Sequence, residues 1–436
     1  MSSSIKNQES ILKKLKIEKL NPMQEEANSA INSSNEIILL SPTGTGKTLA
    51  FLLPIISNLD ESCSEIQALI VVPTRELAIQ IESVIREMGS GFKATAVYGG
   101  RSGSKEKIEL KHRPAILVGT PGRIADHIRR ERFSTESIST LVLDEFDKSL
   151  EIGFKVEMEE IISELTYVNK KILTSATKGV EIPHFVGLRK PIEIDFSDDG
   201  IPKLKVKTVI SEEKDKLETL VKLLSNIGNK PGIIFCNFKD TIQDVCYYLS
   251  DEGISFGSYS GSMEQQDREK ALIKFRNGTH QLIVATDIAA RGIDIPELKF
   301  IIHYELPNRE KEFIHRNGRT ARMESDGTAY ILKWKHDKLP DFINNVEIEE
   351  LKDSPIPKPS TWKTLHINGG RKDKISKGDI AGLFFKQANL NKDELGIIEL
   401  KQNDVYVAVN KDKADFIVEK FNNTRIKKKK VRIRIM

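Results

Sequence analysis

One eight-residue segment has the composition of a loop that binds phosphate groups. Residues 41–48 read Ser-Pro-Thr-Gly-Thr-Gly-Lys-Thr, after an apolar run at 37–40 and before a helical pattern at 49–59. A strand that leads through such a loop into a helix aims backbone N–H groups and the positive end of the helix dipole at one point. Lys47 would add a charge for the β- and γ-phosphates, and the Thr48 hydroxyl would bind Mg²⁺. The glycines alone would suit a plain turn, but the Gly-Lys-Thr ending favours a nucleoside triphosphate site.

A pair of acidic residues could complete this chemistry. Asp144 and Glu145 follow the apolar segment 141–143, which has the pattern of a buried strand. Adjacent carboxylates at the tip of a strand can take different tasks, so we expect Asp144 to bind Mg²⁺ and Glu145 to position the attacking water. A solvated acidic turn is the usual alternative for such a pair, but the preceding strand favours a functional one.

A series of motifs runs in order along residues 20–335, and together they resemble the DEAD-box RNA helicases of superfamily 2. The motifs are Asn-Pro-Met-Gln ending at Gln24, the loop at 41–48, Pro-Thr-Arg-Glu-Leu-Ala at 73–78, Gly99-Gly100, Thr-Pro-Gly-Arg at 120–123, Asp-Glu-Phe-Asp at 144–147, Ser-Ala-Thr at 175–177, the strand at 233–237, Gln265 with Arg268, Ala-Thr-Asp at 285–287 leading to Arg-Gly-Ile-Asp at 291–294, and His-Arg-Asn-Gly-Arg-Thr-Ala-Arg at 315–322. Any one of them could arise by chance, but the ordered series leaves little room for that.

The resemblance implies ATP and Mg²⁺ as cofactors and RNA as the partner. It implies a catalytic group of Lys47, Asp144, Glu145, Arg319 and Arg322, with Thr48 and Asp144 at the metal. It implies ATP contacts from Gln24, Thr43, Gly44, Thr45, Gly46, Lys47, Thr48, Gly292 and Asp294, and coupling of hydrolysis to domain closure by Asp147, Ser175, Thr177 and His315. It implies backbone contacts to RNA from Thr74, Arg75, Gly99, Gly100, Thr120, Arg123, Gln265, Arg268 and Thr286.

Two positions depart from the family pattern. Phe146 stands in the acidic motif where the family name implies alanine, so the pocket around this side chain must differ. Asn7 occupies the place, 17 residues before Gln24, where family members carry an aromatic residue that stacks on the adenine. We therefore expect weaker stacking behind the adenine, while the roles of Asp144 and Glu145 need not suffer.

The elements that must position these residues alternate between short strands and helices. Continuous apolar strands separated by helices indicate parallel sheets that are covered on both faces. The prediction is an α/β chain with two tandem RecA-like parallel-sheet domains and a small C-terminal RRM-like α+β domain. We place the ATP-binding domain at 1–200, the helicase C-terminal domain at 201–345, a proline-rich linker at 346–361 and the third domain at 362–436.

The third domain is strongly basic. Residues 362–436 carry 18 lysines and arginines against 9 acidic residues, a net charge of +9, whereas residues 1–361 carry 49 against 54, a net charge of −5. A basic appendage on an acidic core suits a polyanion such as RNA. Segments 364–375 and 405–409 resemble the DbpA-type RNA-binding domain. The candidate RNA contacts are Arg371, Lys372, Lys374, Lys377, Tyr406 and the run 427–430, although Tyr406 could simply be packed and the lysine run could be a solvated end.

Three functions compete for this pattern. The preferred one is an ATP-dependent RNA helicase that locally unwinds or remodels structured RNA, and the third domain resembles those of helicases that act on ribosomal RNA of the large subunit. An ATP-gated RNA clamp with little unwinding is the alternative, and a DNA translocase is disfavoured by the RRM-like tail. The chain has neither a signal-like apolar stretch nor a run of about 20 apolar residues, so we expect a cytoplasmic protein away from membranes. We also expect a monomer. Its three cysteines have no metal spacing.

Overall fold

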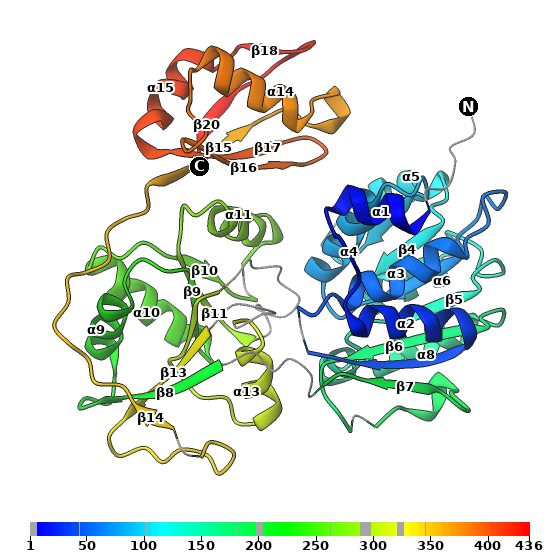
Figure 1. The fold of residues 1–436 in the computed structure, drawn as a ribbon, viewed down its shortest axis with the longest axis horizontal. Helices are drawn as coiled ribbons and strands as arrows, with labels where there is room; N and C mark the ends of the chain where they lie inside the picture. Colours follow the sequence, from blue (N-terminus) through cyan, green and yellow to red (C-terminus); the bar gives the residue numbers. More distant parts are fainter. Residues whose placement is uncertain are drawn as a thin grey trace. The chain divides into compact units, whose positions relative to one another are not determined.

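The chain forms two compact units that divide near residue 201, the second of which also contains the small C-terminal domain (Figure 1). The structure is a computed structural model, and it describes residues 7–42, 44–100, 103–179, 181–197, 204–261, 263–287, 298–320, 327–344 and 346–436. The predicted site residues Thr43, Gly292, Asp294 and Arg322 lie outside the described residues. In the described part of the chain no helix is both long and apolar enough to span a bilayer.

The first unit contains a seven-stranded sheet in which every neighbouring pair of strands is parallel. The strands are β1 (Glu36–Leu40), β2 (Ala68–Val71), β3 (Ala94–Val97), β4 (Ile116–Gly119), β5 (Thr140–Leu143), β6 (Lys170–Ser175) and β7 (Ile192–Asp195), in the spatial order β3-β4-β2-β5-β6-β1-β7. The helices are α1 (Gln8–Leu15), α2 (Pro22–Ser33), α3 (Lys47–Ser57), α4 (Arg75–Met88), α5 (Gly103–Lys111), α6 (Pro121–Arg129), α7 (Phe146–Glu151) and α8 (Lys155–Glu164), with the 3₁₀ turn η1 (His184–Val186).

Both faces of this sheet are buried, which explains its continuous apolar strands. Ile37 and Leu39 of β1 pack into one hydrophobic cluster, and Ile38 and Leu40 of the same strand pack into another on the opposite face. Successive side chains of a strand point to opposite faces, so a strand covered on both sides must be apolar at every position. Phe146 belongs to the second cluster and is 2% exposed, so the apolar core holds the ring that replaces the family's alanine.

The second unit repeats this architecture. Its strands are β8 (Leu204–Ser211), β9 (Gly232–Phe235), β10 (Gly257–Tyr259), β11 (Leu282–Ala285), β12 (Phe300–His303), β13 (Gly327–Trp334) and β14 (Glu347–Ile348), in the order β10-β11-β9-β12-β13-β8-β14, with all described pairs parallel. Its helices are α9 (Leu217–Ile227), α10 (Lys239–Asp251), α11 (Gln265–Arg276) and α13 (Glu310–Asn317). Strand β14 falls within the segment predicted as linker and adds to the edge of this sheet.

The C-terminal domain has an antiparallel sheet with helices on one side. Its elements are β15 (Trp362–Ile367), η2 (Arg371–Asp373), α14 (Lys377–Gly382), the π-helical turn η3 (Leu383–Gln387), β16 (Leu395–Leu400), β17 (Val405–Asn410), α15 (Lys411–Phe421), a hairpin of β18 (Arg425–Ile426) and β19 (Lys429–Lys430), and β20 (Ile433–Ile435). The sheet order β16-β17-β15-β20 is that of a βαββαβ fold. The fold class predicted from the sequence is confirmed for all three parts.

Candidate nucleotide and RNA sites

Loop 41–48 joins β1 to α3, as the sequence predicts. Gly44 and Gly46 have φ values of +89° and +88°, which L-residues with a side chain rarely adopt. A Cβ atom on Gly46 would also lie 2.4 Å from Nε2 of Gln24, so a side chain there would displace the Gln24 amide from the loop. Helix α3 begins at Lys47, and Gly46 provides no side chain that could cap its first N–H groups. The backbone thus leaves the helix N-terminus open to an anion.

Gln24 is bound to this loop, a contact that the sequence does not predict. Its Nε2 donates to the Gly46 carbonyl at 3.2 Å, and its Oε1 accepts from the Asn21 N–H at 3.1 Å. The Asn21 side chain in turn caps α2 and donates to the Thr45 carbonyl at 3.0 Å. The start of α2 therefore holds two consecutive residues of the loop, and adenine recognition by Gln24 stays a prediction.

Two buried charges of opposite sign lie in this region. Lys47 Nζ donates to the carbonyls of Ser41 at 2.5 Å and Pro42 at 2.8 Å, and burial lowers its pKa to about 8. Burial and the nearby Glu145 raise the pKa of Asp144 to about 6. Both charged forms are disfavoured because both groups are removed from water. A phosphate beside Lys47 and a cation beside Asp144 would favour the charged forms again, so these residues fit ATP and Mg²⁺.

The acidic motif sits at the end of β5 and is fixed by the adjacent strand β6. The Thr174 hydroxyl donates to Asp144 Oδ1 and accepts from the Glu145 N–H at 3.1 Å. Glu145 has φ +49°, a left-handed conformation that is costly for a residue with a side chain and is common at functional sites. The Thr177 hydroxyl donates to Asp147 Oδ2 at 2.9 Å, and Ser175 and Thr177 are hydrogen-bonded to each other. The three coupling residues predicted in this unit are therefore in contact.

Lys148 is a further member of this group that sequence reasoning missed. Its Nζ lies 2.8 Å from Glu145 Oε2, and its side chain is 1% exposed. A buried ammonium needs a partner, so Lys148 holds the Glu145 carboxylate in place. The only sequence signal is the i,i+3 spacing at the start of α7, which occurs widely on helix surfaces and indicates nothing by itself.

The order of strands divides the carboxyl edge of the first sheet into two halves. Apart from Gln24 in α2, the described nucleotide and coupling candidates of this unit lie at or after the ends of β5, β6 and β1, which are neighbours. The candidate RNA residues follow β2, β3 and β4, which form the other side of the sheet: Thr74 and Arg75 after β2, Gly99 and Gly100 after β3, and Thr120 and Arg123 after β4. Ligands of open α/β sheets bind at this edge, so the fold brings each predicted set together.

Contacts within the RNA half are partly as expected. A Cβ on Gly99 or Gly100 would lie 3.2 or 2.8 Å from the Arg75 guanidinium, so Arg75 and the two glycines form one surface. The Thr74 hydroxyl caps α4 by accepting from the Leu77 N–H at 3.2 Å. Arg123 is bound to carboxylates, with its Nε 2.7 Å from Oε2 of the buried Glu106. The contact of Arg123 with RNA stays a prediction.

The second sheet shows a similar division. Gln265 begins α11 after β10, with Arg268 one turn later, and Thr286 follows the neighbouring strand β11. His315 lies in α13, and Arg319 follows this helix; they are 8% and 4% exposed. The RNA candidates thus follow β10 and β11, the first two strands of the spatial order. The candidates for hydrolysis and coupling follow β12 in the chain.

Arg316, which carries no predicted role, organises this edge. It is 1% exposed, and its Nε and Nη2 donate to both oxygens of Asp287 at 2.6 and 2.5 Å. Its other contacts are Nη1 to the Glu305 carbonyl at 2.6 Å and Nη2 to Asn237 Oδ1 at 2.7 Å. One guanidinium therefore joins the segments that follow β9, β11 and β12.

Arg316→Ala is expected to destabilise the second unit by about 3 kcal/mol, because it leaves Asp287 and Asn237 without their buried partner. The chain has two tryptophans, Trp334 and Trp362, and both lie in this unit. Tryptophan fluorescence therefore follows its thermal unfolding, and the midpoint should fall by about 5–10 °C. Arg309→Ala, at the exposed start of the same helix, is the matched control and should leave the midpoint unchanged. An Arg316→Ala midpoint equal to that of the control would contradict the structural role.

Asn7 caps a helix, and the three cysteines are buried or partly buried. Asn7 Oδ1 caps α1 by accepting from the Ser10 N–H at 2.9 Å, and Asn7 is exposed. Cys236 is buried in an apolar cluster, and burial raises its pKa, as it raises the pKa of Cys246 to about 11. Within the described ranges, no group of three or more histidine, cysteine or acidic side chains is placed to hold a metal ion.

In the C-terminal domain several of the predicted basic residues are exposed and lie near one another, and two of them, Lys427 and Lys429, are paired with Asp379 and Asp373. Lys372 on η2, Lys374 directly after it and Lys377 at the start of α14 are exposed, and Arg371 is partly exposed. The β18–β19 hairpin lies beside them, since Lys427 Nζ donates to the Lys374 carbonyl at 2.9 Å. Tyr406 lies on the sheet, partly buried, with its ring centroid 5.2 Å from that of His366.

Comparisons with known proteins agree with this geometry. Family models match for the DEAD/DEAH box helicase over residues 21–183, the helicase conserved C-terminal domain over 215–324 and the DbpA RNA binding domain over 364–435. The ATP-dependent RNA helicase DbpA of Escherichia coli (strain K12) is 32% identical over 431 residues, which covers 96% of this chain and 94% of that protein. The DbpA of Bacillus subtilis (strain 168) is 32% identical over 449 residues, covering 94% and 93%.

Solved structures with the same fold include complexes with RNA. S. cerevisiae Dbp5 bound to RNA and ADP BeF3 superposes with a TM-score of 0.66 at 27% identity, covering 77% of this chain and 89% of that one. Mss116p bound to ssRNA and AMP-PNP gives a TM-score of 0.68 at 27% identity, covering 77% and 74%.

Proposed function

Because this chain belongs to the DEAD-box ATP-dependent RNA helicases of the DbpA type, we propose that it locally unwinds or remodels ribosomal RNA during assembly of the large ribosomal subunit. The observation that carries this proposal is a complete helicase core joined to a DbpA RNA-binding domain on one chain. The core candidates contact the RNA backbone and read no bases, so the choice of RNA falls to the third domain.

The proposed mechanism assigns one task to each group. Loop 41–48 binds the triphosphate, and Thr48 and Asp144 would hold a Mg²⁺ ion that would offset phosphate charge. Glu145 positions the attacking water, with Lys148 and Thr174 fixing its orientation. Arg319 and Arg322 stabilise the charge that builds on the γ-phosphate when the domains close, and His315 links closure to Asp147 and Thr177. ATP binding favours closure on bent RNA, and hydrolysis releases the RNA.

Removal of the third domain tests its targeting role. A chain cut after Ser360 should keep basal ATPase and stimulation by excess generic RNA, because both helicase sheets and their candidate sites lie before residue 360. Its preference for large-subunit rRNA over unrelated RNA of equal length should fall to about one. The salt dependence of RNA binding should become shallower, because fewer phosphate contacts release fewer counterions. A truncated protein that still prefers one rRNA segment would place specificity in the core and contradict the proposal.

An ATP-gated clamp would share the RNA-stimulated ATPase but would not separate strands. Displacement of a short labelled duplex beside the rRNA segment distinguishes the two functions. We expect ATP-dependent displacement of this duplex; stable ATP-dependent binding without displacement would establish the clamp instead.

A further inference from the structure

The sheet of the third domain uses both of its faces. Leu365 and Ile367 of β15 and Val405 and Val407 of β17 point into the apolar core formed with α14 and α15. Trp362, Thr364 and His366 alternate with these residues on β15 and therefore lie on the other face. Thr364 on that second face is 0% exposed, although it is not part of the domain's own core. Another part of the second unit must therefore cover it.

The covering segment is the C-terminal end of α11 and the residues after it. The Thr364 hydroxyl lies 2.7 Å from the Thr279 hydroxyl and accepts from Asn277 Nδ2 at 3.3 Å. The indole of Trp362 lies on Gly278, where an added Cβ would be 3.5 Å from Cδ1 of the ring. These contacts give the interface a neutral, closely packed centre.

Two ion pairs lie beside that centre, on the side of β16. Arg276 Nη2 and Nε donate to the two oxygens of Glu399 on β16 at 2.9 and 3.1 Å, which is the bidentate geometry that fixes orientation as well as distance. Lys401 Nζ lies 2.8 Å from Glu269, two turns earlier on α11. Charges from both sides are thus matched along one face of the helix.

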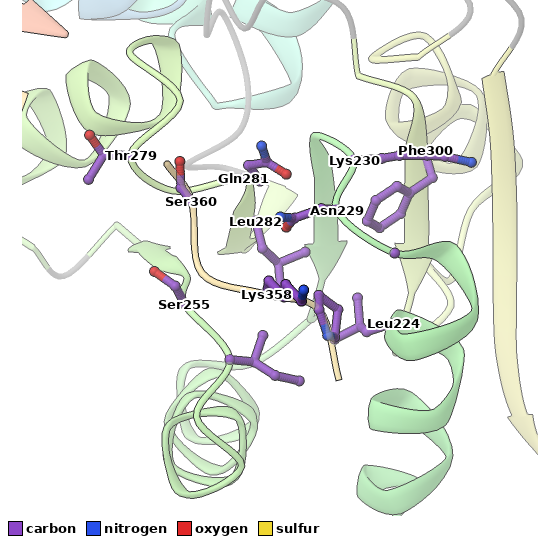
Figure 2. Close-up of a pocket in the computed structure, with 13 residues that line it drawn as sticks. Leu224, Asn229, Lys230, Ser255, Thr279, Gln281, Leu282, Phe300, Lys358 and Ser360 are labelled. Atoms are coloured by element: carbon purple, nitrogen blue, oxygen red, sulfur yellow. The ribbon is translucent and has the colours of Figure 1, made fainter. Parts of the chain in front are cut away.

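The segment that precedes the third domain is also attached to the second unit at several points. Ile348 of β14 pairs with β8, and the Lys352 N–H donates to Asn226 Oδ1 at 2.8 Å. Figure 2 shows the stretch that carries Lys358 and Ser360 passing beside Leu282 and Asn229, where Pro357 and Lys358 line a pocket. The Ser360 hydroxyl then donates to the Gly278 carbonyl at 2.5 Å. These contacts attach the proline-rich segment, which sequence analysis predicts as a linker, to the second unit.

Helix α11 therefore connects two functions. It begins at Gln265 and Arg268, which are predicted to hold the RNA backbone, and its other end carries the third domain. We propose that the third domain works as a docked arm, held at the C-terminal end of α11 through the second face of its sheet. This attachment sets a fixed distance between the RNA segment that the third domain recognises and the duplex that the core remodels. Twelve helical residues span about 18 Å, so the two RNA contacts are separated by a rigid element. This inference rests on the proposed function and specifies how that function selects its substrate.

Charge exchange across the dock tests the inference on the full-length protein. Arg276→Glu and Glu399→Arg each place like charges together, and the double variant restores opposite charges. We expect each single variant to raise, by about threefold to tenfold, the concentration of rRNA-linked duplex that gives half-maximal ATPase, and the double variant to recover most of this loss. Stimulation by poly(A) should be unchanged in all three variants, because neither residue belongs to the ATP site or to the predicted RNA contacts.

A fluorescence measurement reports directly on the contact between the third domain and the end of α11. In a Trp334→Phe background Trp362 is the sole tryptophan, and it lies on Gly278 in the interface. Arg276→Glu should shift its emission to longer wavelength as water reaches the indole, and the double exchange should reverse the shift. Unchanged emission in the single variants would overturn the docked arrangement. A shift without any change in rRNA preference would overturn its functional role.

A covalent lock gives the converse test. The Thr279 and Thr364 hydroxyls are close enough for cysteines at both positions to form a disulfide. The oxidised double variant should retain full stimulation by rRNA-linked duplex, whereas release of the arm during the cycle would make the lock inhibitory and overturn the proposal. Reduction of the same sample, and the Thr279→Cys single variant, control for the three native cysteines. If poly(A) does not stimulate ATP hydrolysis by the unaltered protein, the proposed function itself is contradicted.

Discussion

Glu145→Gln is expected to bind ATP nearly as well as the unaltered protein and to hydrolyse it slower by orders of magnitude. Glutamine keeps the shape of the side chain but is a far weaker base and orients water poorly. The backbone of this residue is fixed by Thr174, so the substitution should leave the loop where it is. Single-turnover hydrolysis with saturating RNA, together with equilibrium binding of a fluorescent ATP analogue, separates the two effects.

The control for this variant must account for Lys148. Loss of the carboxylate leaves the buried ammonium facing a neutral amide, so some loss of stability is expected alongside the loss of hydrolysis. Glu159→Gln, an exposed position on α8, should change neither property. Near-normal turnover in Glu145→Gln would remove Glu145 from the catalytic group.

Arg319→Ala should spare ATP binding and reduce turnover by about 10³-fold or more, because a guanidinium that stabilises transition-state charge contributes little to the ground state. Arg319→Lys keeps the charge but loses the planar fork, so it should recover only a small part of the rate. Lys338→Ala, an exposed cation of the same unit, is the matched control.

Arg319 is 4% exposed, so folding must be measured in the same samples. Tryptophan fluorescence follows the unfolding of this unit. If the unfolding midpoint of Arg319→Lys is unchanged, its slower ATP turnover is due to lost catalysis and not to misfolding. A variant with weaker ATP binding and an unaltered hydrolysis step would contradict the assignment of Arg319 as an arginine finger.

The parts of the fold that sequence analysis predicted depend on local patterns. Apolar runs such as 141–143 and 282–285 are strands because both faces of each sheet are covered, and the same signal placed the chemical groups directly after them. Parallel strands then carry Thr74, Gly99 and Thr120 to one half of an edge, and Lys47, Asp144 and Ser175 to the other. Alternation of strands and helices was therefore enough to predict the fold, and the roles of the residues at this edge stay predictions.

The contacts that sequence analysis missed join residues far apart in the chain. Arg276 and Glu399 are 123 positions apart, and Arg316 meets Asn237 across 79 positions. Periodicity indicates which face of an element is buried, but it does not identify the polar partner across an interface. The proline-rich composition of 353–360 likewise indicates stiffness and says nothing about the domain surface to which the segment binds.

We propose that this chain is an RNA-dependent ATPase that its third domain directs to large-subunit rRNA. The most direct measurement is the ATPase rate of the full-length protein against fragments that tile the large-subunit rRNA, with small-subunit fragments and DNA of equal length as controls. We expect one large-subunit segment to reach half-maximal stimulation at a concentration at least tenfold lower than that of every control. Equal stimulation by all RNA fragments, or stimulation by DNA as strong as by RNA, would contradict it.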